Sequence, residues 1–318
     1  MGWVDRTVLI VLGVAYKAVK GLFINSLSLD GGKDTVELPK LHVTCPVSIS
    51  DRNVQLYERA IALQEERSSK ASGKRMADQF LLAAMTNQLM LLLVVHPGLP
   101  VSPLGGVNVR NRIEFFSGSD DTLRDMTAYA TVGGKNNLAR VVKRGIEFDI
   151  HVDIRSTRSN NNLVLRQIIT ILAPCKTKPS TSKATTTSTE EKEDEVEYNT
   201  IGQVEMSSSA PGLWCRVCGD YNPIHVSSLL AKLFGFPGKI AHGNHVVAKT
   251  LKMMDCEGKM EGCGQGKDRW VEMQFRRPMV LPIRLGVEVG AGNSNDLVHW
   301  QCVGKQGKVH VTGTVGQM

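Results

Sequence analysis

Hydrophobic residues in the last third of the chain recur first at the spacing of helices. Ser227 and Ser228 can cap a short helix, which Gly235 and Pro237 would end. A second helix is expected to start near Gly243, with its apolar positions facing inward. The apolar positions of these two helices are Leu229, Leu230, Leu233 and Phe234, followed by Val246, Val247, Leu251 and Met254.

Four segments in which apolar and polar residues alternate follow the two helices. They read RWVEMQFRRP, PIRLGVEV, LVHWQCV and KVHVTGTV, and a period of two is the pattern of a half-buried strand. Helices followed by consecutive strands indicate an α+β fold with an antiparallel sheet, because alternating βαβ units would place a helix between the strands.

The first half of the chain repeats this order of elements. The apolar segment ADQFLLAAMTNQLMLLLVV predicts a long helix, and GVNVRNRIEFF predicts a strand after it. Two more strands, GIEFDIHVDIRSTR and NNLVLRQIITIL, are predicted on either side of a turn at residues 159–162. A helix and then a sheet, twice over, indicates a duplicated unit.

A segment with almost no large apolar residues divides the chain. It reads KTKPSTSKATTTSTEEKEDEVEYNT, and such a composition cannot bury enough surface to offset the entropy of ordering it. We therefore predict a flexible linker at residues 176–200, between an N-terminal unit at 27–175 and a C-terminal unit at 201–318.

Residues 1–26 contain an apolar run from Val8 to Tyr16 and a single acidic residue. The run is shorter than the roughly 20 residues of a spanning helix. A targeting or membrane-surface helix, a cleaved signal and a helix packed on the body of the protein are the alternatives. No other segment is expected to cross a membrane. Seven cysteines, an odd number, indicate free thiols in a reducing compartment, so we expect an intracellular protein, with mitochondrial or membrane association as alternatives.

The charge balance suits an anionic partner. The net charge is +7 and the isoelectric point is near 9.0, which fits nucleic acid, a membrane surface or a phosphate-bearing metabolite. The basic residues are scattered and few aromatic residues accompany them, so we expect no nucleic-acid partner.

The stretch CGDYNPIHVSSLLAKLFGF, residues 218–236, contains the most suggestive chemistry. Pro223 fixes its own backbone and moves Asn222 out of the helical region, which lets Asp220 and His225 converge. A carboxylate and an imidazole held together can bind a water molecule, accept a proton from it and pass one on. The alternative is a turn whose histidine only caps the next helix.

Gly243 is expected at the N-terminus of the second helix, eighteen residues after His225. The free N–H groups and the dipole of a helix N-terminus stabilise negative charge, as an oxyanion hole does. A glycine there lets a substrate carbonyl approach the backbone, although a plain turn glycine is the alternative.

The run WCRVCGDYNPIHVSSLLAKLFGFPGKIAHGNHVV resembles the MaoC-like dehydratases, the (R)-specific enoyl-CoA hydratases also called hydratase 2. Their signature is a Ser-Gly-Asp-x-Asn-Pro-x-His loop, followed by an Ala, a Gly-Phe and a His-Gly. QFRRPMVLPIRLGVEV is similar to the family's Phe-Arg-x-Pro strand pair, so the resemblance extends from about Glu197 to the C-terminus. The matching residues are Gly219, Asp220, Asn222, Pro223, His225, Ala231, Gly235, Phe236, His242 and Gly243.

The resemblance implies a double hot-dog fold, in which an antiparallel sheet wraps a central helix in each repeat. It implies a hydro-lyase of fatty acid metabolism that reversibly converts trans-2-enoyl thioesters to (3R)-hydroxyacyl thioesters. No cofactor is expected beyond the CoA or acyl carrier protein that carries the substrate. By position, Asp220 and His225 form the catalytic dyad, Asn222 braces the loop, and the Gly243 N–H receives the thioester oxygen. The expected substrate-binding residues are Gly219, Tyr221, Phe236, His242, Arg276 and Arg277.

Some features depart from the family pattern or allow another interpretation. Cys218 stands where the family usually has Ser, and Trp214, Cys215, Lys239 and Asn244 also replace commoner residues. Arg276 and Arg277 are candidates to meet phosphates of the carrier, with a solvated strand end as the alternative. A zinc site or a redox pair is a further alternative for the cysteines, although we predict no metal. The cysteines concerned are Cys215, Cys218, Cys256 and Cys263.

The first half lacks the motif. Its matching loop is expected near SISDRNVQLYERA, which has Asp51 and Asn53 but neither the proline nor the histidine. This half resembles the inactive repeat of double hot-dog hydratases, where loss of the dyad frees room for a long acyl chain. An acyl-CoA thioesterase and a non-catalytic acyl-CoA-binding protein are the alternative functions, and a monomer and a homodimer are both open.

Overall fold

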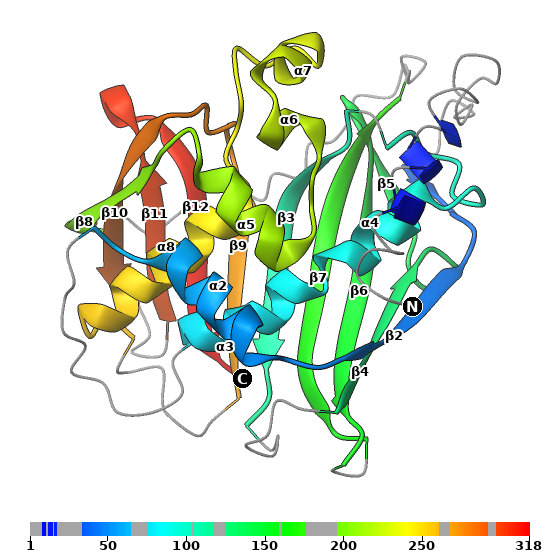
Figure 1. Ribbon diagram of the computed structural model, residues 1–318, viewed down its shortest axis with the longest axis horizontal. Coiled ribbons are helices and arrows are strands. Elements are labelled where there is room, and N and C mark those ends of the chain that lie inside the picture. The colour runs from blue at the N-terminus through cyan, green and yellow to red at the C-terminus, as the bar shows by residue number, and fades with distance from the viewer. Residues whose placement is uncertain are drawn as a thin grey trace.

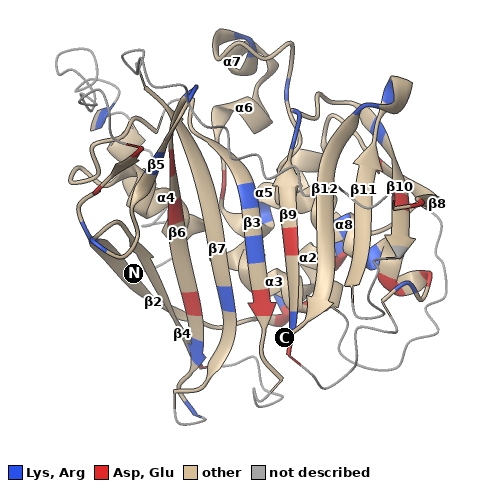
Figure 2. Ribbon diagram, turned by 180° about the vertical axis from the view of Figure 1, so that it is seen from behind, with Lys and Arg blue, Asp and Glu red and all other residues tan. Residues whose placement is uncertain are grey.

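The computed structural model describes residues 8–10, 12–14, 16–17, 34–64, 76–103, 105–117, 125–158, 161–175, 196–260, 268–291 and 297–318. The described strands form one 12-stranded antiparallel sheet. The long helices gather on one face of this sheet, and the opposite face is open (Figures 1 and 2).

Two units of the same topology make up the sheet. The first contains β1 (Thr35–Val36), β2 (Leu41–Val47), α2 (Asp51–Ile61), α3 (Met76–Met85), α4 (Asn87–Val95), β3 (Val107–Phe115), β4 (Met126–Val132), β5 (Ala139–Val142), β6 (Gly145–Ser156) and β7 (Leu163–Pro174). The second contains β8 (Asn199–Met206), α5 (Ala210–Cys218), α6 (Pro223–Val226), α7 (Ser228–Leu233), α8 (Gly243–Cys256), β9 (Arg269–Phe275), β10 (Ile283–Ala291), β11 (Leu297–Val303), the 3-10 turn η1 (Lys305–Gly307) and β12 (Val309–Gln317).

Strand order shows the duplication directly. The first unit runs β2-β4-β6-β7-β3 across the sheet, and the second runs β8-β10-β11-β12-β9. In both, a strand precedes the helices and the first strand after the central helix lies at the joint. The two joint strands, β3 and β9, pair with each other, with Ile113 opposite Val271. The duplication that the order of elements predicted is therefore present, and one sheet runs through both units.

The central helices carry the apolar core. In α8, the predicted inward residues Val246, Val247, Leu251 and Met254 are fully buried. The helix predicted in the first half is divided at Thr86, whose hydroxyl donates to the Leu82 and Ala83 carbonyls at 3.3 and 3.1 Å. A side chain that bonds the carbonyls of the preceding turn bends a helix at that point.

The expectation that no segment besides the N-terminus is apolar enough to cross a membrane is corrected by α3 and α4. Residues Met76–Val95 are long and apolar enough by length and composition, but 72% of their most apolar window is buried inside the fold. This burial is what the core helix of a folded domain requires.

Leu229 and Leu233 of α7 are 77% and 78% exposed, because this short helix projects from the body instead of packing on it (Figure 1). Two other sequence predictions need correction. The segment expected as a loop near SISDRNVQLYERA is the helix α2, with a capping box between Ser50 and Asn53. Strand β8 begins at Asn199, inside the predicted linker, and residues 176–195 lie outside the described part of the chain.

Described residues of the N-terminal segment contact the body of the protein near the end of α4, where a Cβ on Gly13 would lie 2.7 Å from the Val95 side chain. Lys17 is 8% exposed, and its ammonium donates to the carbonyls of Val94, Leu99 and Val101 at 2.6, 2.8 and 3.0 Å. Positive charge and donors at the C-terminal end of a helix satisfy its free carbonyls. This contact supports a packed helix among the alternatives, and most of residues 1–26 lie outside the described ranges.

The open face of the first unit carries paired charges (Figure 2). Arg166 contacts Asp153 at 2.8 Å, and Arg112 contacts Glu114 at 2.9 Å. A hollow of about 360 Å³ on this face is lined by Glu114, Tyr129, Thr131, His151, Asp153, Arg166 and Ile168. Its lining comes from strands of the first unit alone, so it is distinct from the predicted dyad.

Candidate active site

The loop that carries the predicted dyad begins where α5 ends. Gly219 closes the helix with φ of 69°, in the left-handed region that favours glycine. A Cβ at this position would also lie 2.1 Å from the side-chain nitrogen of Gln88 in α4. The backbone conformation and the contact with the first unit therefore both require glycine immediately before Asp220.

Asp220 and Asn222 fix each other. The Asn222 N–H donates to Oδ1 of Asp220 at 3.0 Å, and the Asn222 side chain accepts the Ile224 N–H at 3.3 Å. This second bond makes Asn222 the N-cap of α6, with Pro223 following it. These two bonds link Asp220 to the start of α6, and Asp220 as a whole residue is 8% exposed.

His225 projects from α6 and is held in one orientation by the backbone. Its Nδ1 lies 2.9 Å from the Ile240 carbonyl. A carbonyl only accepts, so Nδ1 carries the proton and Nε2 keeps a lone pair. Burial lowers the pKa of His225, and the negative charge of Asp220 opposes this effect, so the ring is neutral at pH 7 and can accept a proton.

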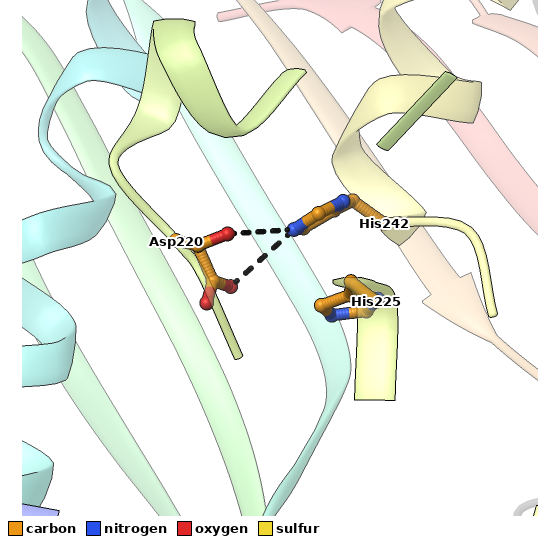
Figure 3. A group of neighbouring side chains, drawn as sticks. All are labelled: Asp220, His225 and His242. Atoms are coloured by element: carbon orange, nitrogen blue, oxygen red, sulfur yellow. Dashed lines mark hydrogen bonds and ion pairs between the residues drawn. The ribbon is translucent and has the colours of Figure 1, made fainter. Parts of the chain in front are cut away.

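His242 completes the cluster (Figure 3). Its ring stacks on that of His225 with centroids 3.6 Å apart. Its Nε2 lies 3.2 Å from the Asp220 carbonyl and 3.8 Å from Oδ2 of the same residue. Burial, followed by the neighbouring charges of His225 and His245, lowers its pKa well below the usual value. His242 therefore contacts both His225 and Asp220, while its predicted contact with substrate stays a prediction.

The cluster is compact enough to act on one small molecule. One side-chain N or O atom from each of Asp220, His225 and His242 lies within 4.8 Å of the others. That separation suits a shared water molecule, and among the described residues this is also the group close enough to hold a metal ion. Neutral imidazoles and a carboxylate are suitable ligands for zinc, but proton transfer by the dyad needs no metal.

Gly243 is the first residue of α8. The first N–H groups of a helix have no partner within the helix, and no side chain caps this end. A Cβ at Gly243 would lie 2.4 Å from the ring of Phe275, so only glycine fits there. The predicted oxyanion site is therefore an open helix N-terminus directly after His242.

The cysteines of α5 are buried thiols. Cys215 donates to the Asp220 carbonyl at 2.9 Å. Burial, and then the charge of Asp220, raise the pKa of Cys215 to about 12 and that of Cys218 well above its usual value. Thiolates are the nucleophiles of thiol exchange, so these buried and protonated thiols argue against the redox alternative. All six described cysteines are free, and Cys263 lies outside the described residues.

The other predicted binding residues surround the cluster at different depths. Tyr221 is 40% exposed beside Asp220, and Phe236 is half-buried at the end of α7, where its N–H donates to the Ala231 carbonyl. Arg276 and Arg277 are exposed and follow Phe275, the residue packed on Gly243. One donates to Thr312 and the other to the Val309 carbonyl, and their predicted role with phosphates is a proposal.

Sequence reasoning gave no site role to three residues near the site, although one of them, Phe275, belongs to the stretch that resembles the family's Phe-Arg-x-Pro strand pair. Phe275 packs on Gly243, and Gln88 packs on Gly219. Asn111 of β3 donates to the Asn244 side chain at 2.7 Å. The last two belong to the first unit, more than a hundred residues from the motif, so the pairing of β3 with β9 and the packing of helices between the units bring them to it.

Comparisons with known proteins agree with this description. The family model described as the MaoC like domain matches residues 175–313. The 3-hydroxyacyl-thioester dehydratase X of Mycobacterium tuberculosis is 34% identical over 102 residues, which is 32% of this chain and 34% of that protein. The matched part thus spans about a third of the length of this curated relative.

Solved structures match most of the chain. HtdX of Mycobacterium tuberculosis has a TM-score of 0.64 at 21% identity and covers 87% of this chain and 100% of its own. A MaoC-like dehydratase from Phytophthora capsici has a TM-score of 0.57 at 14% identity, over 88% and 96%. A conserved hypothetical protein of Mycobacterium tuberculosis, described as a double hotdog fold, has a TM-score of 0.53 at 11% identity, over 89% and 97%. The predicted resemblance and fold are confirmed: the chain has a double hot-dog fold and carries a MaoC-like domain at residues 175–313.

Proposed function

We propose that the protein is a hydro-lyase that reversibly adds water to trans-2-enoyl thioesters and gives (3R)-hydroxyacyl thioesters. The observation that carries the proposal is the convergence of Asp220 and His225 beside the open N-terminus of α8 at Gly243. The MaoC-like domain and the relative named as a 3-hydroxyacyl-thioester dehydratase support the same reaction class.

The dyad holds and activates the water. With Nδ1 of His225 donating to Ile240, Nε2 is free to accept a proton from a water molecule that also donates to the Asp220 carboxylate. The water oxygen then forms a bond to C3 of the enoyl group, and the electron pair of the C2–C3 double bond moves toward the thioester carbonyl. Proton return to C2 completes the addition, so that one water is consumed and no redox change occurs.

Gly243 stabilises the charge that develops during this step. The thioester oxygen becomes enolate-like as C3 is attacked, and an N–H at a helix N-terminus stabilises an anion at that place. Removing one such donor costs roughly 100- to 1000-fold in kcat in well-studied enzymes. The packing of Phe275 on Gly243 keeps the first turn of α8 at a fixed position relative to the dyad.

We propose that the CoA or acyl-carrier part of the bound substrate extends from the site to the surface past the C-terminal end of β9. Arg276 and Arg277 stand at the surface within two residues of Phe275, so their guanidinium groups can meet phosphates of CoA or of an acyl carrier protein. Charge pairing of this kind falls with ionic strength. A rise of KM with salt, reduced in Arg276→Gln, would support this placement.

The loss of enoyl-thioester ultraviolet absorbance in the presence of the purified protein tests the proposed function. Hydration by the wild type and loss of roughly 100-fold or more in Asp220→Asn and His225→Gln is the expected result. Asp51→Asn and His42→Gln change the same residue types at exposed positions and should retain activity. Full activity in the dyad variants would refute the assignment.

Two further measurements separate the alternatives. Release of free CoA thiol instead of a hydroxyacyl thioester would indicate a thioesterase, and binding without either change would indicate an acyl-binding protein. Chiral analysis of the product tests the stereochemistry, because an (S)-hydroxy product would contradict the proposed face of water addition.

A further inference from the structure

Three buried carboxamide side chains of the first unit lie at the boundary with the site. They are Gln88, Asn111 and Gln167, with exposed fractions of 2%, 0% and 1%, and we call them the carboxamide cluster. Each keeps at least one side-chain N or O atom without a hydrogen-bond partner among the described residues. Dyad residues and the oxyanion glycine come from the second unit, so the cluster faces the chemistry from the opposite side of the joint.

Gln88 contacts the loop that carries Asp220. Its Nε2, Cδ and Cγ atoms lie 2.1, 2.5 and 2.6 Å from the position a Cβ would take on Gly219. The carboxamide therefore rests on the backbone one residue before Asp220. Its Nε2 is a donor that has no acceptor among the described residues.

Asn111 contacts the start of α8, next to the proposed oxyanion site at Gly243. Its Nδ2 donates to Oδ1 of Asn244 at 2.7 Å, and Asn244 directly follows Gly243. Its own Oδ1 accepts from no described residue. An acceptor is thus left free within one residue of the proposed oxyanion site, where the sequence had shown only that Asn244 departs from the family's usual methionine.

Gln167 extends the cluster across the sheet. Its register partner on β3 is Ile113, and Asn111 stands two residues along that strand. Opposite residues of an antiparallel pair share a face, and diagonal neighbours lie roughly 7–8 Å apart. Gln167 is therefore on the same face as Asn111, and neither its nitrogen nor its oxygen has a partner among the described residues.

Free polar atoms in such a place are costly. An unsatisfied buried donor or acceptor costs about 1–3 kcal/mol, and native proteins contain only a few of them. Here one such atom is on Gln88 beside Gly219, one is on Asn111 beside Asn244, and two are on Gln167 on the sheet face that Asn111 shares, although leucine or methionine at these positions would avoid that cost. Both donors and acceptors are present, which is the complement of a hydroxyl group.

The burial of these unpartnered side-chain atoms indicates which part of the substrate they would contact. The carrier of an acyl thioester must reach the surface, whereas the free atoms are fully enclosed. The acyl chain is the part that goes inward from the reacting carbons, and it would pass from the second unit into the first. A plain alkyl chain would leave the free atoms unsatisfied.

We propose that the carboxamide cluster binds a hydroxyl group on the acyl chain, so that the preferred substrates are enoyl thioesters hydroxylated beyond C4. This inference rests on the proposed function for the thioester and its reaction. The cluster itself is a specificity-determining set of residues: it touches the chain and leaves proton transfer to the dyad.

The test compares a plain medium-chain 2-enoyl-CoA with the same chain carrying one hydroxyl at successive carbons beyond C4. We expect the best-placed hydroxyl to raise kcat/KM of the wild type about tenfold, because one satisfied hydrogen bond of about 1.4 kcal/mol has that effect. In Gln88→Met and Gln167→Met, the ratio of kcat/KM for the hydroxylated chain to kcat/KM for the plain chain should fall to about one. Gln203→Met, at an exposed glutamine of β8, is the matched control and should keep the preference.

Calorimetric binding of the corresponding saturated acyl-CoA pair separates this inference from the proposed function. Preferential binding of the hydroxylated chain without any turnover would refute the hydro-lyase and leave the hydroxyl site intact. Equal binding and equal turnover of the plain and hydroxylated chains by the wild type would overturn the inference. An unchanged preference in Gln88→Met and Gln167→Met, with higher melting temperatures, would also overturn it and assign the cluster to structure alone.

Discussion

Replacing His245 with glutamine is expected to remove part of the acid sensitivity of the folded protein. His245 lies in α8 with 1% of its surface exposed. Its ring stacks on Trp214 at 4.8 Å, and its Nε2–H donates to the Ala60 carbonyl at 2.7 Å. Burial lowers its pKa from 6.5 to about 4, and the nearby Lys249 adds to this effect.

The sign and size of the effect follow from proton linkage. Between pH 6.5 and about pH 4 the unfolded chain holds a proton on this residue and the folded chain does not, so the free energy of unfolding falls as the pH is lowered. Each pH unit in that window is worth about 1.4 kcal/mol. Between pH 7.5 and pH 5 the loss from His245 alone is therefore about 2 kcal/mol.

Urea unfolding of wild type and His245→Gln at both pH values measures the difference. Glutamine keeps an N–H donor for Ala60, and any loss of stacking on Trp214 is the same at the two pH values and cancels. We expect the wild type to lose about 2 kcal/mol more than the variant over this range. His42→Gln, at an exposed histidine of β2, should behave as the wild type. An equal loss in His245→Gln and wild type would show that His245 gains its proton as easily in the folded chain, and would refute the reasoning.

Three other predictions concern the site itself. Gly243→Ala should lower kcat about 100-fold or more, because the new methyl group would collide with the Phe275 ring and shift the helix N-terminus; partial rescue by Phe275→Leu in the double variant would identify the collision as the cause, and full activity of Gly243→Ala would contradict it. Gly219→Ala should lower the free energy of unfolding by about 1–3 kcal/mol, since φ is 69° and Gln88 fills the space, and urea unfolding measures this; an unchanged midpoint would refute it. The acid limb of kcat/KM should have its midpoint below pH 6.5, because burial lowers the pKa of His225 and the ring must be neutral to accept a proton; a midpoint above 6.5 in a pH–rate profile would argue against His225 as the base.

The part of the site that sequence reasoning found is the part built by local constraints. Asp220, Asn222 and His225 lie within six residues, and a proline and an Asx cap determine how they converge. Gln88 and Asn111 reach the same place through strand register and helix packing between units, and Phe275 reaches Gly243 from β9 of the same unit. Contacts of that kind depend on the relative placement of distant segments, which no local pattern contains.

The errors in the fold have the same origin. The spacing of Leu229 and Leu233 predicted a helix with an apolar side, but spacing does not say whether a body lies beneath that side, and none covers these two residues in the described chain. Strand β8 was missed because only Val204 and Met206 of its eight residues are buried, so its alternation is weak. Strands β6 and β7, which have buried residues along their whole length, were found, whereas β4 was missed despite its alternating burial.

The hydrogen-bonded joint between β3 and β9 has a consequence for how such a protein can arise. If either unit were made alone, its joint strand would present an unpaired edge ready to accept another strand. Two copies of one ancestral unit could meet through that edge as a symmetric pair. Fusion of the two genes would then have preserved the β3–β9 interface. One unit would no longer have been under selection for catalytic activity, and such a history would leave a first unit without the Asp/His motif beside a second unit that keeps it.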